Sequence, residues 1–199
     1  MEFVYNDMSA QVSMAQYIND CVDVPRIIKG CQGCKNYFKL WSCPPFGFDP
    51  VKIWRDYSKL TLHARKISFP KELTEKTFDA YGLTAQYFEI WNKERRKFFI
   101  ELMEREQSTP GSLMLAAGCC NECATCARAN GAPCIKPDRL RYSIESLGGD
   151  VEKTLELYLG QGRAYARIYA ACGRTDAKIN IAYIPAPWLL LDRRACARG

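Results

Sequence analysis

The sequence predicts an α+β fold: a compact domain with a small mixed sheet, flanking helices and two cysteine-rich metal-binding loops. Segments that alternate apolar and polar residues, as strands do, are interspersed with longer segments of helical spacing. Most of the 11 cysteines fall within residues 21–48 and 118–137. With 199 residues, 48% of them hydrophobic, the chain can form a single domain over 1–199 whose core does not depend on disulfides.

The first third of the chain is expected to contain little regular structure. Residues 11–20 are predicted to form a short helix, and residues 21–48 a loop punctuated by cysteine, glycine and proline. Asp49 and Pro50 are typical of a helix cap and first turn. The partial alternation in Leu60–Phe69 predicts a half-buried strand.

The middle of the chain, from Lys71 to about Gln107, has helical spacing, and Gly82 is expected to divide it into two helices. The residues expected to face the core are Phe88, Trp91, Phe98 and Leu102. Residues Ser112–Ala117 are predicted to form a short strand that leads directly into the second cysteine loop.

The remaining elements follow the second cysteine loop. Asp150–Leu159 is predicted to be a helix, with Asp150 as a candidate cap. Ala177–Ile184 is predicted to be the last strand. The cysteine loops are therefore expected at the ends of strands in a small sheet.

The second cysteine loop has the clearest ligand spacing. From Cys120 it reads C-x2-C-x2-C-x7-C, and the ligands that it offers are Cys120, Cys123, Cys126 and Cys134. A C-x2-C-x2-C run with a more distant fourth cysteine is typical of [4Fe–4S] proteins. The x7 gap differs from the shorter gap of bacterial ferredoxins.

Zinc is the alternative metal, because four cysteines also form structural zinc sites. Such sites usually join two well-separated CxxC arms, whereas here three cysteines crowd one short segment, which better suits a cubane. The single histidine, His63, excludes a zinc site with two or more histidines. His63 lies in the predicted strand and is interpreted as structural.

The first cysteine loop offers three ligands, namely Cys31, Cys34 and Cys43, in the pattern C-x2-C-x8-C-P-P. A cubane normally takes four cysteines, and Cys21 is the nearest candidate for the fourth, followed by Cys119, Cys172 or Cys196. Alternatively, the fourth iron is open to water, a substrate or a partner. The sequence does not decide whether the two loops build one site or two.

Both loops, read together, resemble a prokaryotic family of predicted metal-binding proteins. The shared segments are C-x2-C with WSCPP (31–45), G-x-C-x2-C-x2-C with a later C-x2-P (118–137), and Arg141, Ser143, Glu145 and Gly148. The resemblance runs from about Cys31 to Val151. It implies a bound metal, an iron–sulfur cluster in particular, and often a redox setting. The last quarter of the chain, with Cys172 and Cys196, departs from the family pattern.

Arg141, Ser143 and Glu145 alternate along the chain, so in an extended segment they would point to the same side. They are candidates for hydrogen bonds to cluster sulfurs or for capping the next helix. The alternative is a buried polar network that orders the loop.

Charge and targeting signals narrow the choice of partners. The formal net charge of +6 falls to about +2 if two thiolate sites of charge about −2 are filled, so no specific nucleic-acid partner is expected. The first residues lack the pattern of a secretory signal, and no apolar run is long enough to span a bilayer. We therefore expect a cytoplasmic protein, because in that reducing compartment cysteines serve as ligands more often than as disulfides.

The sequence predicts an iron–sulfur protein with one or two [4Fe–4S] clusters that transfers electrons to a partner redox enzyme or larger complex. No separate catalytic constellation accompanies the cysteines, which favours an electron-transfer or accessory subunit over a stand-alone enzyme. A homo-oligomer is also compatible with the sequence. The alternative functions are a structural-zinc interaction module and an enzyme that uses an open-corner [4Fe–4S] cluster.

Overall fold

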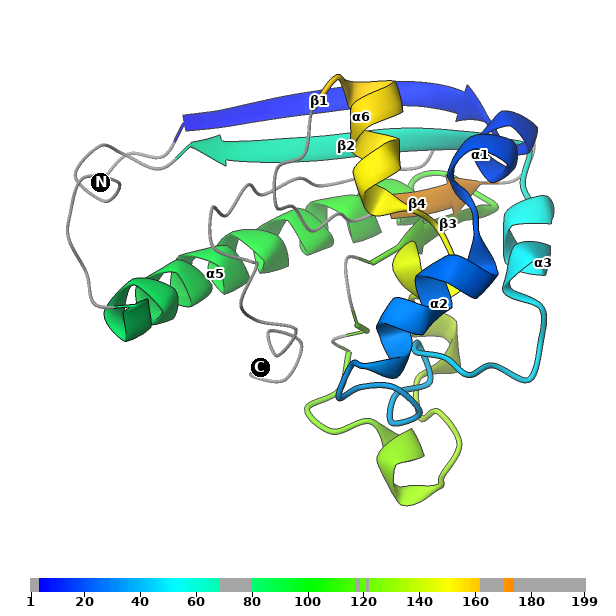
Figure 1. The fold of residues 1–199 in the computed structure, drawn as a ribbon, viewed down its shortest axis with the longest axis vertical. Helices are drawn as coiled ribbons and strands as arrows, with labels where there is room; N and C mark the ends of the chain where they lie inside the picture. The colour runs from blue at the N-terminus through cyan, green and yellow to red at the C-terminus, as the bar shows by residue number, and fades with distance from the viewer. Residues whose placement is uncertain (1–3, 69–79, 117–118, 121, 162–169, 174–199) are drawn as a thin grey trace.

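The computed structural model describes residues 4–68, 80–116, 119–120, 122–161 and 170–173. It contains a four-stranded sheet with the order β1-β2-β4-β3 (Figure 1). The strands are β1 (Val4–Ser13), β2 (Lys59–Ser68), β3 (Ser112–Leu115) and β4 (Ala170–Gly173). The α-helices are α1 (Met14–Cys21), α2 (Val24–Gln32), α3 (Pro50–Arg55), α5 (Ala80–Gln107) and α6 (Val151–Leu159). The α+β prediction is confirmed.

The sheet is built from three antiparallel ladders. The longest ladder joins β1 and β2, from the pair Val4 and Ser68 to the pair Ser13 and Lys59. Within the described part of the chain, the parallel component of the predicted mixed sheet is confined to one bridge, between Ala116 and Ser143. That bridge connects the end of β3 to the segment that follows the second cysteine loop.

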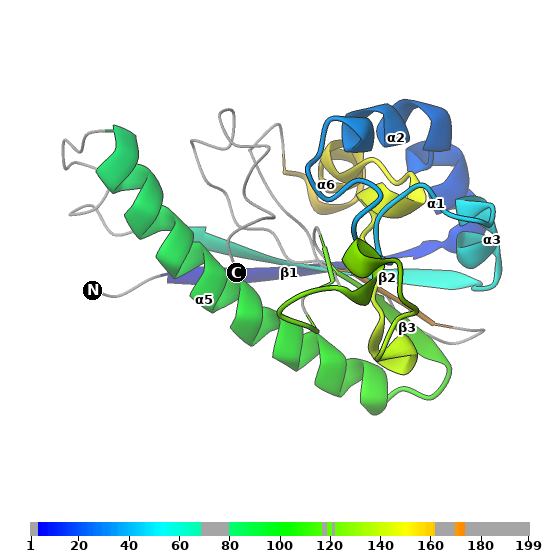
Figure 2. The ribbon, with the colours of Figure 1, turned by 90° about the horizontal axis from the view of Figure 1, so that it is seen from below.

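Alternation along β2 separates two packing faces. Leu60, Leu62 and Ala64 are buried in the larger core, together with residues of α1, α3 and α6. On the opposite face, Arg65 reaches α5 through its hydrogen bonds to Glu101. Figure 2 shows the sheet nearly edge-on, with α1, α2, α3 and α6 grouped beside it and α5 crossing it obliquely.

Helix α5 covers the other face through a smaller core. Phe98 and Leu102, both predicted to face the core, are buried there with Met103, Met114 and Ala116. The side chains of Phe88 and Trp91 lie outside the described residues. The predicted break at Gly82 is wrong, because α5 runs without interruption from Ala80 to Gln107. A single glycine costs a helix only about 1 kcal/mol, which tertiary packing readily offsets.

The N-terminal segment differs most from the prediction. Residues 11–20 divide at Ser13, which ends β1 and whose hydroxyl accepts a hydrogen bond from the amide of Gln16 to cap α1. Residues 24–32, predicted to be loop, form α2. Asp23 caps α2 and Pro25 lies in its first turn, which is the same signal that correctly predicted α3 at Asp49.

The other predicted elements match the structure where it describes them. The strand at Leu60–Phe69 is β2, the strand at Ser112–Ala117 is β3, and the helix at Asp150–Leu159 is α6. Asp150 caps α6 as predicted. The strand predicted at Ala177–Ile184 lies outside the described residues. Across the part of the chain that is described, no helix is both long and apolar enough to cross a bilayer.

Candidate metal centre

The first cysteine loop begins in the last turn of α2, which carries Cys31. A hydrogen bond of 2.9 Å from the amide of Cys34 to the carbonyl of Cys31 closes the CxxC turn. A second turn, from the amide of Cys43 to the carbonyl of Leu40 at 3.0 Å, presents Cys43. Local backbone turns therefore fix the direction of the chain at each cysteine.

Helix α2 is held against the short 3₁₀ helix η3 (Glu145–Leu147). The amide of Asp23 donates to the carbonyl of Gly148 over 2.8 Å. Gly148 has φ of +83°, and a Cβ atom there would lie 2.5 Å from Cγ2 of Val24. Only glycine fits both the left-handed backbone and this close approach, so Gly148 sets the position of α2 and of Cys31.

The second cysteine loop is closed by an acidic side chain between its ligands. The carboxylate of Glu122, whose side chain is only 9% exposed, accepts a hydrogen bond from Nε of Arg139 over 2.6 Å. The ammonium of Lys136 donates to the carbonyl of Glu122 over 2.9 Å. These contacts tie the arm with Cys120 and Cys123 to the returning arm that follows Cys134.

The two loops pack against each other, although about 80 residues separate them in sequence. The amide of Cys120 donates to Oγ of Ser42 over 3.1 Å, and Ser42 is fully buried. The indole N–H of Trp41 donates to the carbonyl of Ala132 over 3.0 Å. Oγ of Ser42 also lies 4.0 Å from Sγ of Cys43, so Ser42 links a cysteine of each loop.

Arg128, in the 3₁₀ helix η1 (Ala127–Asn130) of the second loop, reaches across to the first. Its guanidinium donates to three backbone carbonyls there, those of Leu40, Cys43 and Pro45. Figures 1 and 2 both show the second cysteine loop beside the segment that follows α2.

Burial divides the nine cysteines whose side chains are described, all of them thiols, into two groups. Cys21 and Cys119 are buried. The other seven are half-buried, and they are Cys31, Cys34, Cys43, Cys120, Cys123, Cys126 and Cys134. Thiolates are preferred ligands of zinc and of iron–sulfur clusters, so the chemistry of this donor set fits either group.

The structure brings the loops together but does not gather their sulfurs around one point. Within the described residues, no three or more His, Cys, Asp or Glu side chains are grouped so that they could hold a metal ion. The predicted ligand set therefore stays a prediction, supported by spacing and by the contact between the loops.

Aromatic side chains cluster where the end of the first loop meets the segment after the second. The rings of Phe46 and Phe48 stack at 4.9 Å, and Tyr142 meets Phe46 edge-on at 5.4 Å. Burial raises the pKa of Tyr142, and the nearby Cys134 raises it further. Tyr142 therefore lies close to Cys134 as well as to the two phenylalanine rings.

Cys21, the first candidate for a fourth ligand of the first loop, is placed differently. It is 2% exposed and packs in the main core at the end of α1. The nine-residue α2, about 13 Å long, lies between Cys21 and the turn that carries Cys34. This placement argues against a shared site for Cys21 and the three cysteines of the first loop.

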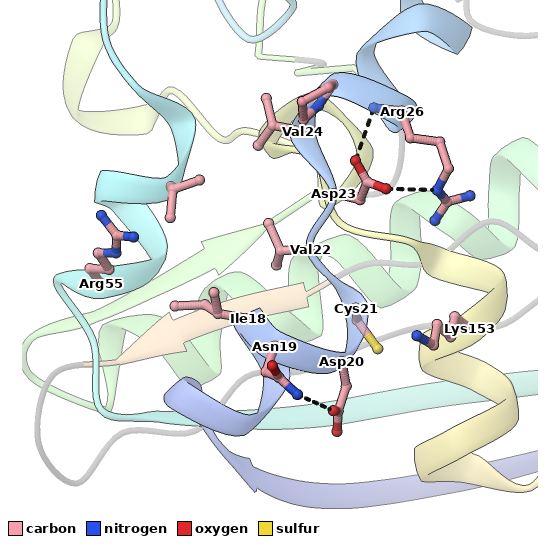
Figure 3. Close-up of a pocket in the computed structure, with 12 residues that line it drawn as sticks. Ile18, Asn19, Asp20, Cys21, Val22, Asp23, Val24, Arg26, Arg55 and Lys153 are labelled. Atoms are coloured by element: carbon pink, nitrogen blue, oxygen red, sulfur yellow. Dashed lines mark hydrogen bonds and ion pairs between the residues drawn. The ribbon is translucent and has the colours of Figure 1, made fainter.

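Cys21 also borders a surface hollow of about 670 Å³ between the ends of α1 and α2, α3 and α6. Figure 3 shows its thiol directed toward Lys153. Burial raises the pKa of Cys21 from an ordinary 9.0 to about 11, which disfavours the thiolate form that a metal site requires.

The raised pKa of Cys21 predicts an alkaline loss of stability. Below about pH 9 the thiol is protonated in both the folded and the unfolded chain, so its contribution to the free energy of unfolding is complete. Between pH 9 and pH 11 the unfolded chain releases a proton that the folded chain retains. The free energy of unfolding therefore falls as the pH rises through this range. Urea unfolding at pH 8 and pH 10.5 should show this loss to be smaller in Cys21→Ala than in wild type. An equal loss in both proteins would show that Cys21 does not titrate in this way.

The residues after the second loop that carry the family resemblance form structural contacts. Arg141 is 8% exposed and pairs with Glu106 of α5, with its Nε 2.9 Å from Oε2 of the carboxylate. Ser143 and Ser146 exchange hydrogen bonds of 3.0 Å between side chain and backbone. Glu145 lies in η3 and not in an extended segment, so the three side chains do not share one strand face. These contacts match the alternative of a buried polar network that orders the loop.

Three residues that position the cysteines, namely Ser42, Glu122 and Arg128, were not predicted from the sequence. Each lies between the cysteines of a motif, where ligand spacing assigns no role to the residue. Glu122 and Arg128 could have been noticed as charged residues between closely spaced cysteines. Their roles could not be predicted, because their partners lie elsewhere in the chain.

Comparison with known protein families identifies the one to which the cysteine loops belong. A family described as "Predicted metal-binding protein (DUF2284)" matches residues 18–164, a range that includes both cysteine loops. No curated protein and no solved structure matches the chain.

Proposed function

Because this chain belongs to the DUF2284 family of predicted metal-binding proteins, we propose that its two cysteine loops hold one or two [4Fe–4S] clusters and that it passes electrons to a partner redox enzyme. The observation that carries the proposal is the contact between the loops, which between them carry seven half-buried cysteines. Half-buried thiols are accessible to metal yet partly shielded from solvent, as cluster ligands need to be.

Spacing favours iron–sulfur over zinc. Cys120, Cys123 and Cys126 lie within seven residues, so they can serve three corners of one cubane, with Cys134 as the fourth ligand. For the first loop, Cys31, Cys34 and Cys43 are the proposed ligands. Structural zinc would explain a rigid loop, but the contacts of Glu122, Arg139 and Lys136 already close the second loop without a metal.

The residues around the cysteine loops suit a bound cluster that carries negative charge. A [4Fe–4S] cluster with four thiolates has a net charge of about −2 when oxidised and supplies one-electron chemistry when bound. Residues 24–48 contain no carboxylate, whereas Lys29, Lys35 and Lys39 are exposed there and would offset such a charge. Phe46, Phe48 and Tyr142 form an aromatic cluster near Cys134.

The proposal includes the setting in which the protein works. Thiolate ligands and oxygen-sensitive clusters require a reducing compartment, so we place the protein in the cytoplasm. The proposed partner is a redox enzyme or a larger complex that accepts the electrons.

Anaerobic purification tests the proposal directly. The expected product is brown, with about four to eight irons per chain and matching acid-labile sulfide, and its electron paramagnetic resonance signal appears after reduction. Colourless protein that contains only zinc would overturn the iron–sulfur assignment and support the structural-zinc module.

The placement of Cys21 favours a second candidate, an enzyme with an open-corner cluster. With Cys21 in the core, the first loop offers three cysteines and not four. A cluster held by three cysteines leaves one iron for a small substrate. Under this alternative, Cys21→Ala retains the cluster, and a small carboxylate or similar ligand changes its spectrum. Loss of the cluster in Cys21→Ala would remove the support for this candidate.

A further inference from the structure

Arg128 connects the second cysteine loop to the first through both hydrogen bonds and ring contacts. Its Nη1 donates to the carbonyls of Leu40 and Cys43 over 2.8 and 2.7 Å, and its Nη2 donates to the carbonyl of Pro45 over 2.8 Å. Its Cζ lies 5.0 Å from the ring centroid of Phe38 and 4.9 Å from that of Trp41. One guanidinium thus engages five residues of the first loop.

These contacts surround Cys43. The accepting carbonyls belong to Cys43 itself and to residues on both sides of it, so the guanidinium fixes the backbone from which the thiol projects. Hydrogen bonds from a charged donor are roughly twice as strong as neutral ones, and arginine can form several at once because its donors lie in a rigid plane.

Arg128 is also attached firmly to the second loop. It follows Cys126 by two residues, and the amide of Ala129 donates to the carbonyl of Cys126 over 3.1 Å. A further bond, from the amide of Gly131 to the carbonyl of Arg128 at 3.0 Å, closes the turn that leads toward Cys134. A change in the position of Cys126 therefore moves the base of the Arg128 side chain.

We propose that Arg128 is a positioning residue that couples the two loops, so that metal bound by the second loop orders the first loop and increases its affinity for metal. This inference rests on the proposed function, because it needs metal on the cysteine thiols. The coupling acts in both directions: metal on the first loop fixes Cys43 and, through Arg128, stabilises the turn after Cys126.

Arg128→Lys is the most informative variant. It keeps one positive charge but replaces the planar fork by a single ammonium group, which cannot satisfy three separate carbonyls in the same geometry. Arg55→Lys is the matched control, because Arg55 is exposed on α3, outside both cysteine loops. Trp41→Phe is a second variant that weakens the contact between the loops to a smaller extent. It keeps a ring beside Arg128 and removes only the hydrogen bond from the indole N–H to the carbonyl of Ala132.

The experiment reconstitutes each protein anaerobically with ferrous iron and sulfide. Iron per chain is counted, and hydrogen exchange of residues 38–45 is measured by mass spectrometry before and after loading. In wild type and Arg55→Lys, loading should slow exchange in this segment. In Arg128→Lys, exchange after loading should be at least about tenfold faster than in wild type, as expected for one lost hydrogen bond to a charged group. Its iron content should fall by about half if each loop holds a cluster, with an intermediate result for Trp41→Phe.

The outcomes distinguish the two proposals. If wild type takes up no iron, both the proposed function and the coupling are wrong. If wild type takes up iron and Arg128→Lys matches it in iron content and in exchange, only the coupling is wrong. Thermal unfolding by circular dichroism checks that the variants fold. Should Arg128→Lys fail that check, the same comparison is made with Arg128→Gln, which keeps a planar amide donor but lacks the charge and the three-carbonyl reach, and exchange equal to that of wild type overturns the coupling.

Discussion

Replacing Cys123 with serine is expected to remove about four irons per chain, which is the content of one cubane. Cys123 is the middle ligand of the C-x2-C-x2-C run and is half-buried, so it is a proposed corner ligand of the second-loop cluster. A serine hydroxyl is a weaker ligand for iron than a thiolate because it keeps its proton at neutral pH. Iron analysis and visible absorbance of the anaerobic protein measure the loss.

Cys119→Ser and Cys21→Ala are the controls for this prediction. Both cysteines are buried, 5% and 2% exposed, and neither belongs to the half-buried set. These variants should keep the iron content of wild type when they fold. Full iron content in Cys123→Ser, or a loss as large in Cys119→Ser, would contradict the ligand assignment, and the second result would make Cys119 a member of the site.

Replacing Trp54 with alanine is expected to lower the free energy of unfolding by about 3–5 kcal/mol. Trp54 of α3 is fully buried in the main core, where its ring lies 5.3 Å from that of Tyr17. Its indole N–H donates to the carbonyl of Leu147 in η3 over 2.9 Å. Alanine removes the ring contacts, leaves a cavity and deprives a buried carbonyl of its donor. Urea unfolding monitored by circular dichroism gives the difference.

Trp54→Phe separates the two contributions. Phenylalanine retains most of the apolar surface but lacks the N–H group, so the loss should be smaller, about 1–3 kcal/mol. If Trp54→Ala and Trp54→Phe cost the same, the hydrogen bond to Leu147 dominates; if Trp54→Ala costs less than about 1 kcal/mol, the described packing of Trp54 is wrong.

The same contact connects the core to the cysteine loops. Trp54 fixes η3 through Leu147, and η3 is followed by Gly148, whose carbonyl accepts a hydrogen bond from the amide of Asp23 at the start of α2. Helix α2 then carries Cys31. The first cysteine loop is thus supported by two layers of structure, the core beneath α2 and the second cysteine loop beside it.

Local signals in the sequence predicted those parts of the fold that depend on neighbouring residues. Asp49 with Pro50, and Asp150, predicted the starts of α3 and α6, because a capping side chain bonds to amides two or three residues away. Partial alternation predicted β2, and a short apolar run predicted β3. Asp23 with Pro25 is the same kind of capping signal for α2. A loop was predicted there instead, because cysteine and glycine residues are frequent in the segment that follows.

Two strands were missed. The second half of β1 does alternate, with Met8, Ala10 and Val12 packed on the main core between polar residues, but the alternation is short and the first half of β1 is exposed. Strand β4 is only four residues long. Both are strands because partners from distant parts of the chain supply their hydrogen bonds. The arrangement of the sheet could not be derived for the same reason.

By itself, the sequence determined the α+β class, the family and the set of candidate thiol ligands, because capping, alternation and CxxC spacing are properties of short segments. Only the tertiary structure decided that the two cysteine loops lie together, that Cys21 belongs to the core, and that Ser42 and Arg128 join the loops. Those facts depend on contacts between residues about 80 positions apart, which arise from packing of the whole chain and leave no periodic pattern in any short stretch.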